Sequence, residues 1–180
     1  MRLVKIGLAS VNTTVGAFAA NVDKAVSAAR EMAADGVMLG VFQEQLVGGY
    51  PVEDLIQWQG FVEGQWPQLE RFARETAGLP SVFVCGVSVM HQGLRYNCAA
   101  PVAGGKILGL VPKEKLPTYN IYYEGRTFSR GVAGMAETHR GVALGITSSG
   151  STSGRSPWKS ARTCGARRGR SGGERTPGRS

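Results

Sequence analysis

The sequence of 180 residues is poor in cysteine and has no long apolar segment. Its three cysteines, Cys85, Cys98 and Cys164, are too few and too irregularly spaced for a disulfide framework or a CxxC metal site. No run approaches the roughly 18 apolar residues of a transmembrane helix. Met1-Arg2 leads directly into LVKIGLAS, which is unlike a signal peptide. We therefore expect a cytoplasmic protein with reduced thiols, no bound metal and no membrane partner.

The positive charge is concentrated at one end of the chain. The formal net charge is +8, which by itself would suggest a nucleic-acid or anionic membrane partner. Residues 151–180 hold eight Lys and Arg residues against the single acid Glu174, which is +7 of that total and leaves +1 for residues 1–150. The sequence thus describes a nearly neutral domain followed by a basic tail.

The first part of the chain predicts a strand, a helix and a second strand. Residues 2–9 alternate apolar and polar side chains, and residues 37–42 (VMLGVF) form a continuous apolar run, typical of a strand buried on both faces. Between them, residues 21–34 place an apolar stripe on one side of a helix, and Gly36 ends it. This order is a βαβ unit.

Further elements follow in quick succession. Residues 65–77 predict a helix that buries Leu69, Phe72 and Ala73. Residues 81–90, 94–102 and 106–112 predict consecutive strands joined by turns at His91-Gln92-Gly93 and Gly104-Gly105. The predicted class is α/β with a mixed sheet that continues at least to Lys113.

Two charged residues lie where predicted strands end. Glu44 follows VMLGVF after one intervening residue, Gln43, and Lys113 directly follows KILGLVP. Sheet ends hold side chains rigidly at the mouth of a site. Each charge taken alone is more readily explained as a solvated loop residue, so the flanking strings decide between the two interpretations.

Together these strings resemble the nitrilase (carbon-nitrogen hydrolase) superfamily, and within it the glutaminase domains of glutamine-dependent NAD synthetases. The resemblance covers about residues 3–140. Four features carry the resemblance, and they occur in the family's order and approximate spacing. They are the glutamate after a buried strand, Gly49-Tyr50-Pro51 with Glu53-Asp54-Leu55, Arg95-Tyr96-Asn97, and Lys-x-x-Leu-Pro-x-Tyr over residues 113–119. Gln43 departs from the pattern, because the family more often has proline there. The fold that the resemblance implies is the α-β-β-α sandwich, of which residues 1–145 would form the incomplete N-terminal half.

The resemblance also implies roles for individual residues. Glu44 would be the general base that activates a thiol nucleophile, and Lys113 would place positive charge beside the oxyanion of the tetrahedral intermediate. Tyr119 matches the family's glutamine-contacting tyrosine, and Glu124 matches a second glutamate that orients the lysine.

The nucleophile that the family requires is not recognisable. It should follow one more strand, in a string such as Cys-Glu-Asp-x-Trp. Cys164 lies in about the right region, but no hydrophobic strand precedes it, so we interpret it as a bystander. Cys85 and Cys98 fall inside predicted strands and are expected to be small buried side chains. We therefore expect this chain to be catalytically inactive.

Residues 146–180 predict a disordered, low-complexity tail that cannot bury enough surface to offset its chain entropy. Read one nucleotide earlier, its codons are compatible with DYLFRFDFG from Ile146 and with VEVCEDVW over residues 158–165. That second string supplies a Cys-Glu-Asp-x-Trp element after a strand. The sequence thus indicates a frame shift near the codons for residues 143–146 in a truncated gene.

Three functions remain open at this point. The leading hypothesis is glutamine hydrolysis that supplies ammonia to an ATP-dependent synthetase domain, absent here, which amidates deamido-NAD. ATP, Mg²⁺ and deamido-NAD would bind in that domain, the intact parent would form a homo-oligomer, and this chain would bind no cofactor or nucleic acid. The second hypothesis is a free-standing nitrilase-family amidase. The third is a non-enzymatic nucleic-acid-binding module with a basic tail, whose binding would depend steeply on salt and would need residues 151–180.

Overall fold

The computed structural model describes residues 3–120 and 122–145. The predictions made for residues 146–180, including the disordered tail, the bystander role of Cys164 and the second reading frame, lie outside the described residues.

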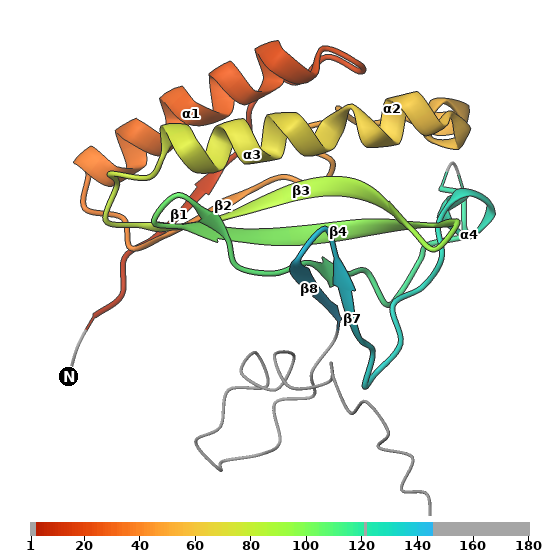
Figure 1. Cartoon of the computed structure of the whole chain (residues 1–180). Coiled ribbons are helices and arrows are strands. Elements are labelled where there is room, and N and C mark those ends of the chain that lie inside the picture. Colours follow the sequence, from red (N-terminus) through yellow and green to blue (C-terminus); the bar gives the residue numbers. More distant parts are fainter. Residues whose placement is uncertain (1–2, 121, 146–180) are drawn as a thin grey trace, which may run out of the picture. The chain divides into compact units, whose positions relative to one another are not determined.

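The main helices lie together on one face of a sheet (Figure 1). They are α1 (Phe18–Ala34), α2 (Gln59–Glu63) and α3 (Gln65–Glu75), and two shorter helical segments are η1 (Glu53–Gln57) and α4 (Glu124–Thr127). The stripe expected on the first helix is buried, and the chain leaves α1 through Gly36 at φ +74°. Leu69, Phe72 and Ala73 of α3 are also buried, as predicted. Within the described ranges, no helix has the length and apolar character that a membrane span requires.

The main sheet is mixed, as the sequence predicted. Its strands are β1 (Ile6–Ala9), β2 (Leu39–Phe42), β3 (Val82–His91), β4 (Leu94–Ala103), β5 (Lys106–Ile107) and β6 (Val111–Pro112). The order is β1-β2-β3-β4-β5, and β6 also pairs with β4. The first three strands run parallel and β3–β4 is antiparallel. Strands β7 (Ala136–His139) and β8 (Val142–Gly145) form a separate hairpin.

The strand predicted over residues 106–112 is divided into β5 and β6. Ile107 pairs with Val102 and Val111 pairs with Ala99, so four steps along one strand match three along the other. This extra residue is a β-bulge. It releases Leu110, whose backbone N–H donates to Ala143 at 2.8 Å and ties the β7–β8 hairpin to the main sheet. The predicted first strand is also shorter, because pairing with β2 begins only at Ile6.

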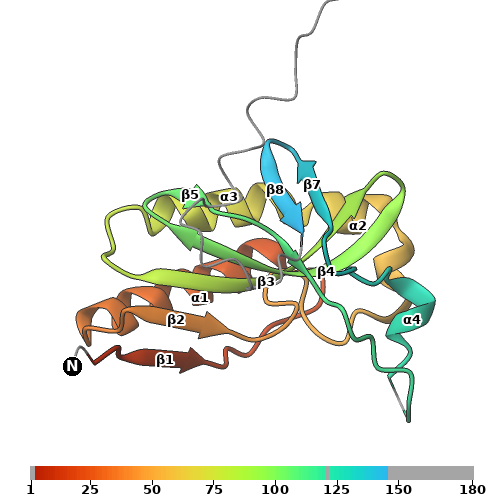
Figure 2. The same cartoon turned by 90° about the horizontal axis from the view of Figure 1, so that it is seen from below.

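The two faces of the sheet differ in burial. Side chains such as Phe83 and Val87 pack beneath the helices in the main core. On the opposite face, Ile6 and Leu8 of β1 are 58% and 83% exposed, and Leu39 and Val41 of β2 are only partly buried. Figure 2 shows the strands from this side, with the main helices behind them. The prediction that the second strand is buried on both faces is therefore wrong for the described chain. A single helical layer covers the sheet, which leaves apolar surface on its other side.

Candidate active site

The site begins with an ion pair between the two residues expected at strand ends. Glu44 follows β2, and Lys113 follows β6. Lys113 Nζ lies 2.8 Å from Glu44 Oε1, although 69 positions separate the residues in the sequence. The mixed sheet explains the meeting, because β2 pairs with β3, β6 pairs with β4, and β3 and β4 pair with each other.

Glu124 contacts the same ammonium group. It is the first residue of α4, and its Oε2 lies 2.8 Å from Lys113 Nζ. The Glu124 side chain is only 8% exposed, whereas that of Glu44 is 45% exposed. Lys113 therefore bridges one buried and one accessible carboxylate.

These contacts shift the pKa values of the buried partners. Burial by itself would lower the pKa of Lys113, but the adjacent Glu124 and Glu44 carboxylates outweigh it and raise that pKa above its ordinary value. Burial raises the pKa of Glu124, and repulsion from Glu44 adds to the rise while Lys113 opposes it. At neutral pH the lysine therefore stays a cation, which is the state that can stabilise an oxyanion.

Asn97 on β4 belongs to the site, and the sequence did not assign it a role. Its side-chain amide donates to Glu44 Oε1, and its backbone C=O accepts the Lys113 N–H at 2.7 Å. It is 4% exposed. The available signal was a polar residue in the middle of a predicted strand, where a buried amide needs a partner.

A cavity of about 490 Å³ opens onto Glu44, Lys113 and Glu124. Its other lining residues are Thr13, Gln43, Tyr50, Pro117, Tyr119 and Tyr122. Tyr119, the predicted substrate contact, is 69% exposed, and its ring lies edge-on to Tyr122 at 5.8 Å between centroids. Tyr50, from the Gly49-Tyr50-Pro51 string, also lines this cavity. Burial, followed by the nearby Glu124 and Glu44 carboxylates, raises the pKa of its phenol.

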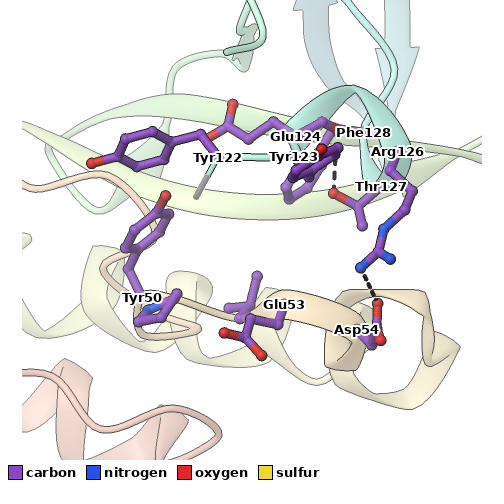
Figure 3. A pocket seen from close by; sticks show the side chains of 11 residues that line it. Tyr50, Glu53, Asp54, Tyr122, Tyr123, Glu124, Arg126, Thr127 and Phe128 are labelled. Atoms are coloured by element: carbon purple, nitrogen blue, oxygen red, sulfur yellow. Dashed lines mark hydrogen bonds and ion pairs between the residues drawn. The ribbon is translucent and has the colours of Figure 1, made fainter. Parts of the chain in front are cut away.

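A second cavity of about 320 Å³ adjoins the first and shares Tyr50, Tyr122 and Glu124 with it (Figure 3). Tyr50 stands on the segment that leads into η1, Tyr122 stands on the segment that leads into α4, and Glu124 is the first residue of α4. Arg126 joins the two segments, because its Nη2 lies 2.6 Å from Asp54 Oδ1. The ion pair links the α4 segment, which carries Glu124, to η1 at the surface.

The two cysteines of the described residues lie away from this ion cluster. Cys85 and Cys98 pack in the core beneath the helices, at 1% and 2% exposure. Burial raises the pKa of both thiols, that of Cys98 to about 12. Neither is a thiolate at neutral pH, so neither is a nucleophile. Among residues 3–120 and 122–145, no group of three His, Cys, Asp or Glu side chains is placed to bind a metal.

The arrangement has a definite chemical capacity. An accessible carboxylate can take up a proton, and the adjacent ammonium can stabilise negative charge that develops on a carbonyl oxygen. Glu124 and Asn97 fix these two groups with respect to each other. The described residues thus bring together a carboxylate and an ammonium group, the two kinds of group that a base and an oxyanion-stabilising partner require.

Relatives found by sequence comparison include glutamine-dependent NAD(+) synthetases. No family model matches the chain. The chain is 34% identical over 128 residues to a glutamine-dependent NAD(+) synthetase of Mycobacterium tuberculosis, which covers 71% of this chain and 19% of the relative. It is 33% identical over 147 residues to that of Thermotoga maritima, which covers 82% of this chain and 25% of the relative. The chain thus spans 19% to 25% of the length of these relatives.

Solved structures agree on the fold. A glutamine-dependent NAD(+) synthetase from Cytophaga hutchinsonii matches with a TM-score of 0.73 and 24% identity, over 80% of this chain and 25% of that one. An amidase of the nitrilase superfamily from Nesterenkonia matches with a TM-score of 0.60 and 20% identity, over 78% of this chain and 53% of that one. At such identities the likeness establishes the α/β architecture alone.

Proposed function

We propose that this chain, a homologue of glutamine-dependent NAD(+) synthetases with the fold of nitrilase-superfamily carbon-nitrogen hydrolases, carries the base and the oxyanion-stabilising group of a glutamine amide hydrolase. The observation that carries the proposal is the position of Lys113 Nζ, 2.8 Å from both Glu44 and Glu124, at the wall of an accessible cavity.

In the reaction, Glu44 takes the proton of a cysteine thiol as its sulfur attacks the amide carbon. The carbonyl oxygen becomes negative beside the Lys113 ammonium. The C–N bond then breaks, and Glu44 returns the proton to the departing nitrogen, which leaves as ammonia. Water, deprotonated by Glu44, cleaves the thioester to give glutamate, and the proton restores the thiol.

The remaining predicted residues act on binding and orientation. Glu124 is the buried anchor of Lys113, because its carboxylate keeps the ammonium at the cavity wall. Tyr119 is placed at the accessible side of the cavity, where it can contact the glutamine that enters.

The proposal for the intact parent is broader. Ammonia released at this site would pass to an ATP-dependent domain, which would bind ATP, Mg²⁺ and deamido-NAD, in a homo-oligomer. The name shared by the sequence relatives supports glutamine as the substrate and NAD as the product.

The test compares this chain with a version in which the reading frame is restored near Gly145. The restored chain should release ammonia from glutamine, because VEVCEDVW would bring a cysteine to the site. Glu44→Gln and Lys113→Ala should each reduce that rate at least about 100-fold. Synthesis from added ammonia by the full-length repaired protein should survive both changes. Matched substitutions at the neighbouring exposed Glu114 and Lys115 should leave the rate unchanged.

The 180-residue chain itself should release no ammonia, with or without Cys164→Ala. Ammonia release that Cys164→Ala abolishes would make Cys164 the nucleophile. Stop codons within a few residues of the repair, or full activity without Glu44 and Lys113, would show that the residues have other roles.

A further inference from the structure

Glu44 lies on a segment that leaves β2 and crosses closely over β3. Gly86 of β3 makes this crossing possible. A Cβ atom at position 86 would overlap the Gln45 nitrogen and would lie 2.7 Å from the Gln43 carbonyl oxygen. The backbone on both sides of Glu44 is therefore in contact with the sheet, so any group that fixes this crossing also fixes Glu44.

Ser88, two residues further along β3, makes the polar contact that holds the crossing. Its hydroxyl donates to Gln45 Oε1 at 2.6 Å, and its backbone N–H donates to Gln65 Oε1 at 3.0 Å. Ser88, Gln45 and Gln65 are each no more than 1% exposed. A hydrogen bond enclosed in this way has no water to replace it, and breaking it leaves a buried polar group without a partner.

The backbone of Gln45 makes this contact more important. Its φ is +54°, in the left-handed region that is unfavourable for a residue with a Cβ atom. Glutamine has no local hydrogen bond of the asparagine type that would favour this conformation. The bond to Ser88 therefore helps to offset the strain of the turn immediately after Glu44.

The sheet register provides a second contact to the same segment. Ser88 on β3 is paired directly with Asn97 on β4. The side chain of Ser88 holds Gln45, and that of Asn97 holds the preceding residue, Glu44. Two opposed residues of one antiparallel pair thus fix two consecutive residues of the crossing segment.

We propose that Ser88 is a positioning residue of the site: through Gln45, its hydroxyl holds the crossing segment so that the Glu44 carboxylate stays against Lys113. The inference rests on the proposed function only in treating Glu44 as the base. It assigns a role in site geometry to a residue that touches neither the cavity nor the ion cluster.

The experiment measures the pKa of the Lys113 ammonium by NMR in the 180-residue chain, so that no catalysis is needed. Contact with Glu44 raises this pKa. Glu44→Gln therefore sets the reference decrease, and Ser88→Ala should lower the pKa in the same direction. In the double variant, Ser88→Ala should cause no further decrease, because the contact on which it acts is already gone.

Ser81→Ala is the matched control. Ser81 immediately precedes β3, is 3% exposed, and its hydroxyl donates to Val37 O at 2.6 Å, far in the fold from Glu44. Ser81→Ala should reduce the stability of the fold about as much as Ser88→Ala does and should leave the pKa of Lys113 unchanged. Ser88→Thr keeps the hydroxyl and should retain the Lys113 pKa of the unsubstituted chain. Gln45→Met removes the acceptor and should reproduce the decrease.

The proposal is overturned if Ser88→Ala leaves the Lys113 pKa unchanged while Glu44→Gln lowers it, or if Ser81→Ala lowers it equally. It is also overturned if Ser88→Ala and Gln45→Met both unfold under conditions in which Ser81→Ala remains folded, because the bond is then a general folding requirement. The measurement uses no free glutamine as substrate. A failure here therefore leaves the proposed function intact, and a failure of the glutamine assay leaves this result intact.

Discussion

The backbone C=O of Asn97 accepts the backbone N–H of Lys113 at 2.7 Å, at the point where β6 ends against β4. The side-chain amide of the same asparagine donates a hydrogen bond to Glu44. One residue of β4 therefore positions both the backbone of Lys113 and the carboxylate with which Lys113 pairs. The ion pair is therefore built onto the sheet and does not depend on two mobile loops.

Asn97→Ala should lower the free energy of unfolding by about 1–2 kcal/mol, because the Glu44 carboxylate loses the charge-assisted hydrogen bond that it accepts from the buried Asn97 side chain. Glu44 is partly solvated, which keeps the loss well below that of a fully buried pair. Urea unfolding measures the change. Asn12→Ala, at an exposed position, should stay within about 0.5 kcal/mol, and an equal loss there would contradict the assignment.

Lys113→Met should raise the pKa of Glu124 further above its ordinary value of 4.5, because burial and Glu44 already raise it and the opposing cation is removed. A raised carboxylate pKa favours the folded state below 4.5, and that contribution is lost as pH rises through the folded-state value. The variant should therefore lose about 1–3 kcal/mol at pH 7 and clearly less at pH 4.

Urea unfolding at the two pH values and NMR titration of the glutamate carboxyls measure these effects. Lys115→Met removes an exposed cation and should show neither. A loss for Lys113→Met that is independent of pH would mean that Lys113 contributes through packing and not through Glu124.

Gly86→Ala should cost about 3 kcal/mol or more, because the added methyl meets backbone atoms of residues 43–45 that cannot move separately. If the chain still folds, the pKa of Lys113 should fall as Glu44 is displaced. Gly78→Ala is the control, since no atom lies within 4 Å of its Cβ position. It should be neutral or slightly stabilising.

The core thiols should not react in the folded protein. Burial holds the pKa of Cys98 at about 12 and raises that of Cys85 as well, so both remain protonated at neutral pH. In a Cys164→Ala chain, brief treatment with an alkylating agent should add no label, and the same treatment in denaturant should add two, as measured by mass spectrometry. Rapid labelling without denaturant would place at least one thiol outside the core.

The uncovered face of the sheet should promote self-association, because Leu8 and its neighbour Ile6 present contiguous apolar surface. Leu8→Thr should reduce the association seen by sedimentation at high concentration and leave the free energy of unfolding within about 0.5 kcal/mol. Leu94→Thr, at the tip of the β3–β4 hairpin, should not affect association. A chain that is monomeric at all concentrations would show that this face is protected.

The sequence alone determined the elements whose signals are local. The apolar stripe of α1, the turns predicted at His91-Gln92-Gly93 and Gly104-Gly105, and the positions of Glu44 and Lys113 at strand ends all follow from periodicity and turn chemistry within short stretches. The structure narrows the first turn to Gln92-Gly93, because His91 still belongs to β3. The family strings then indicated that the two charges belong to one site.

Only the tertiary structure decided which groups touch across long separations. Asn97 meets Glu44 over 53 positions and Ser88 meets Gln45 over 43, and no local pattern encodes such pairings. The burial of Glu124 and the bulge that releases Leu110 to β8 likewise depend on the packed sheet. The apolar run over residues 37–42 predicted burial on both faces, but burial is set by the layers that surround a strand, and its own residues cannot specify them.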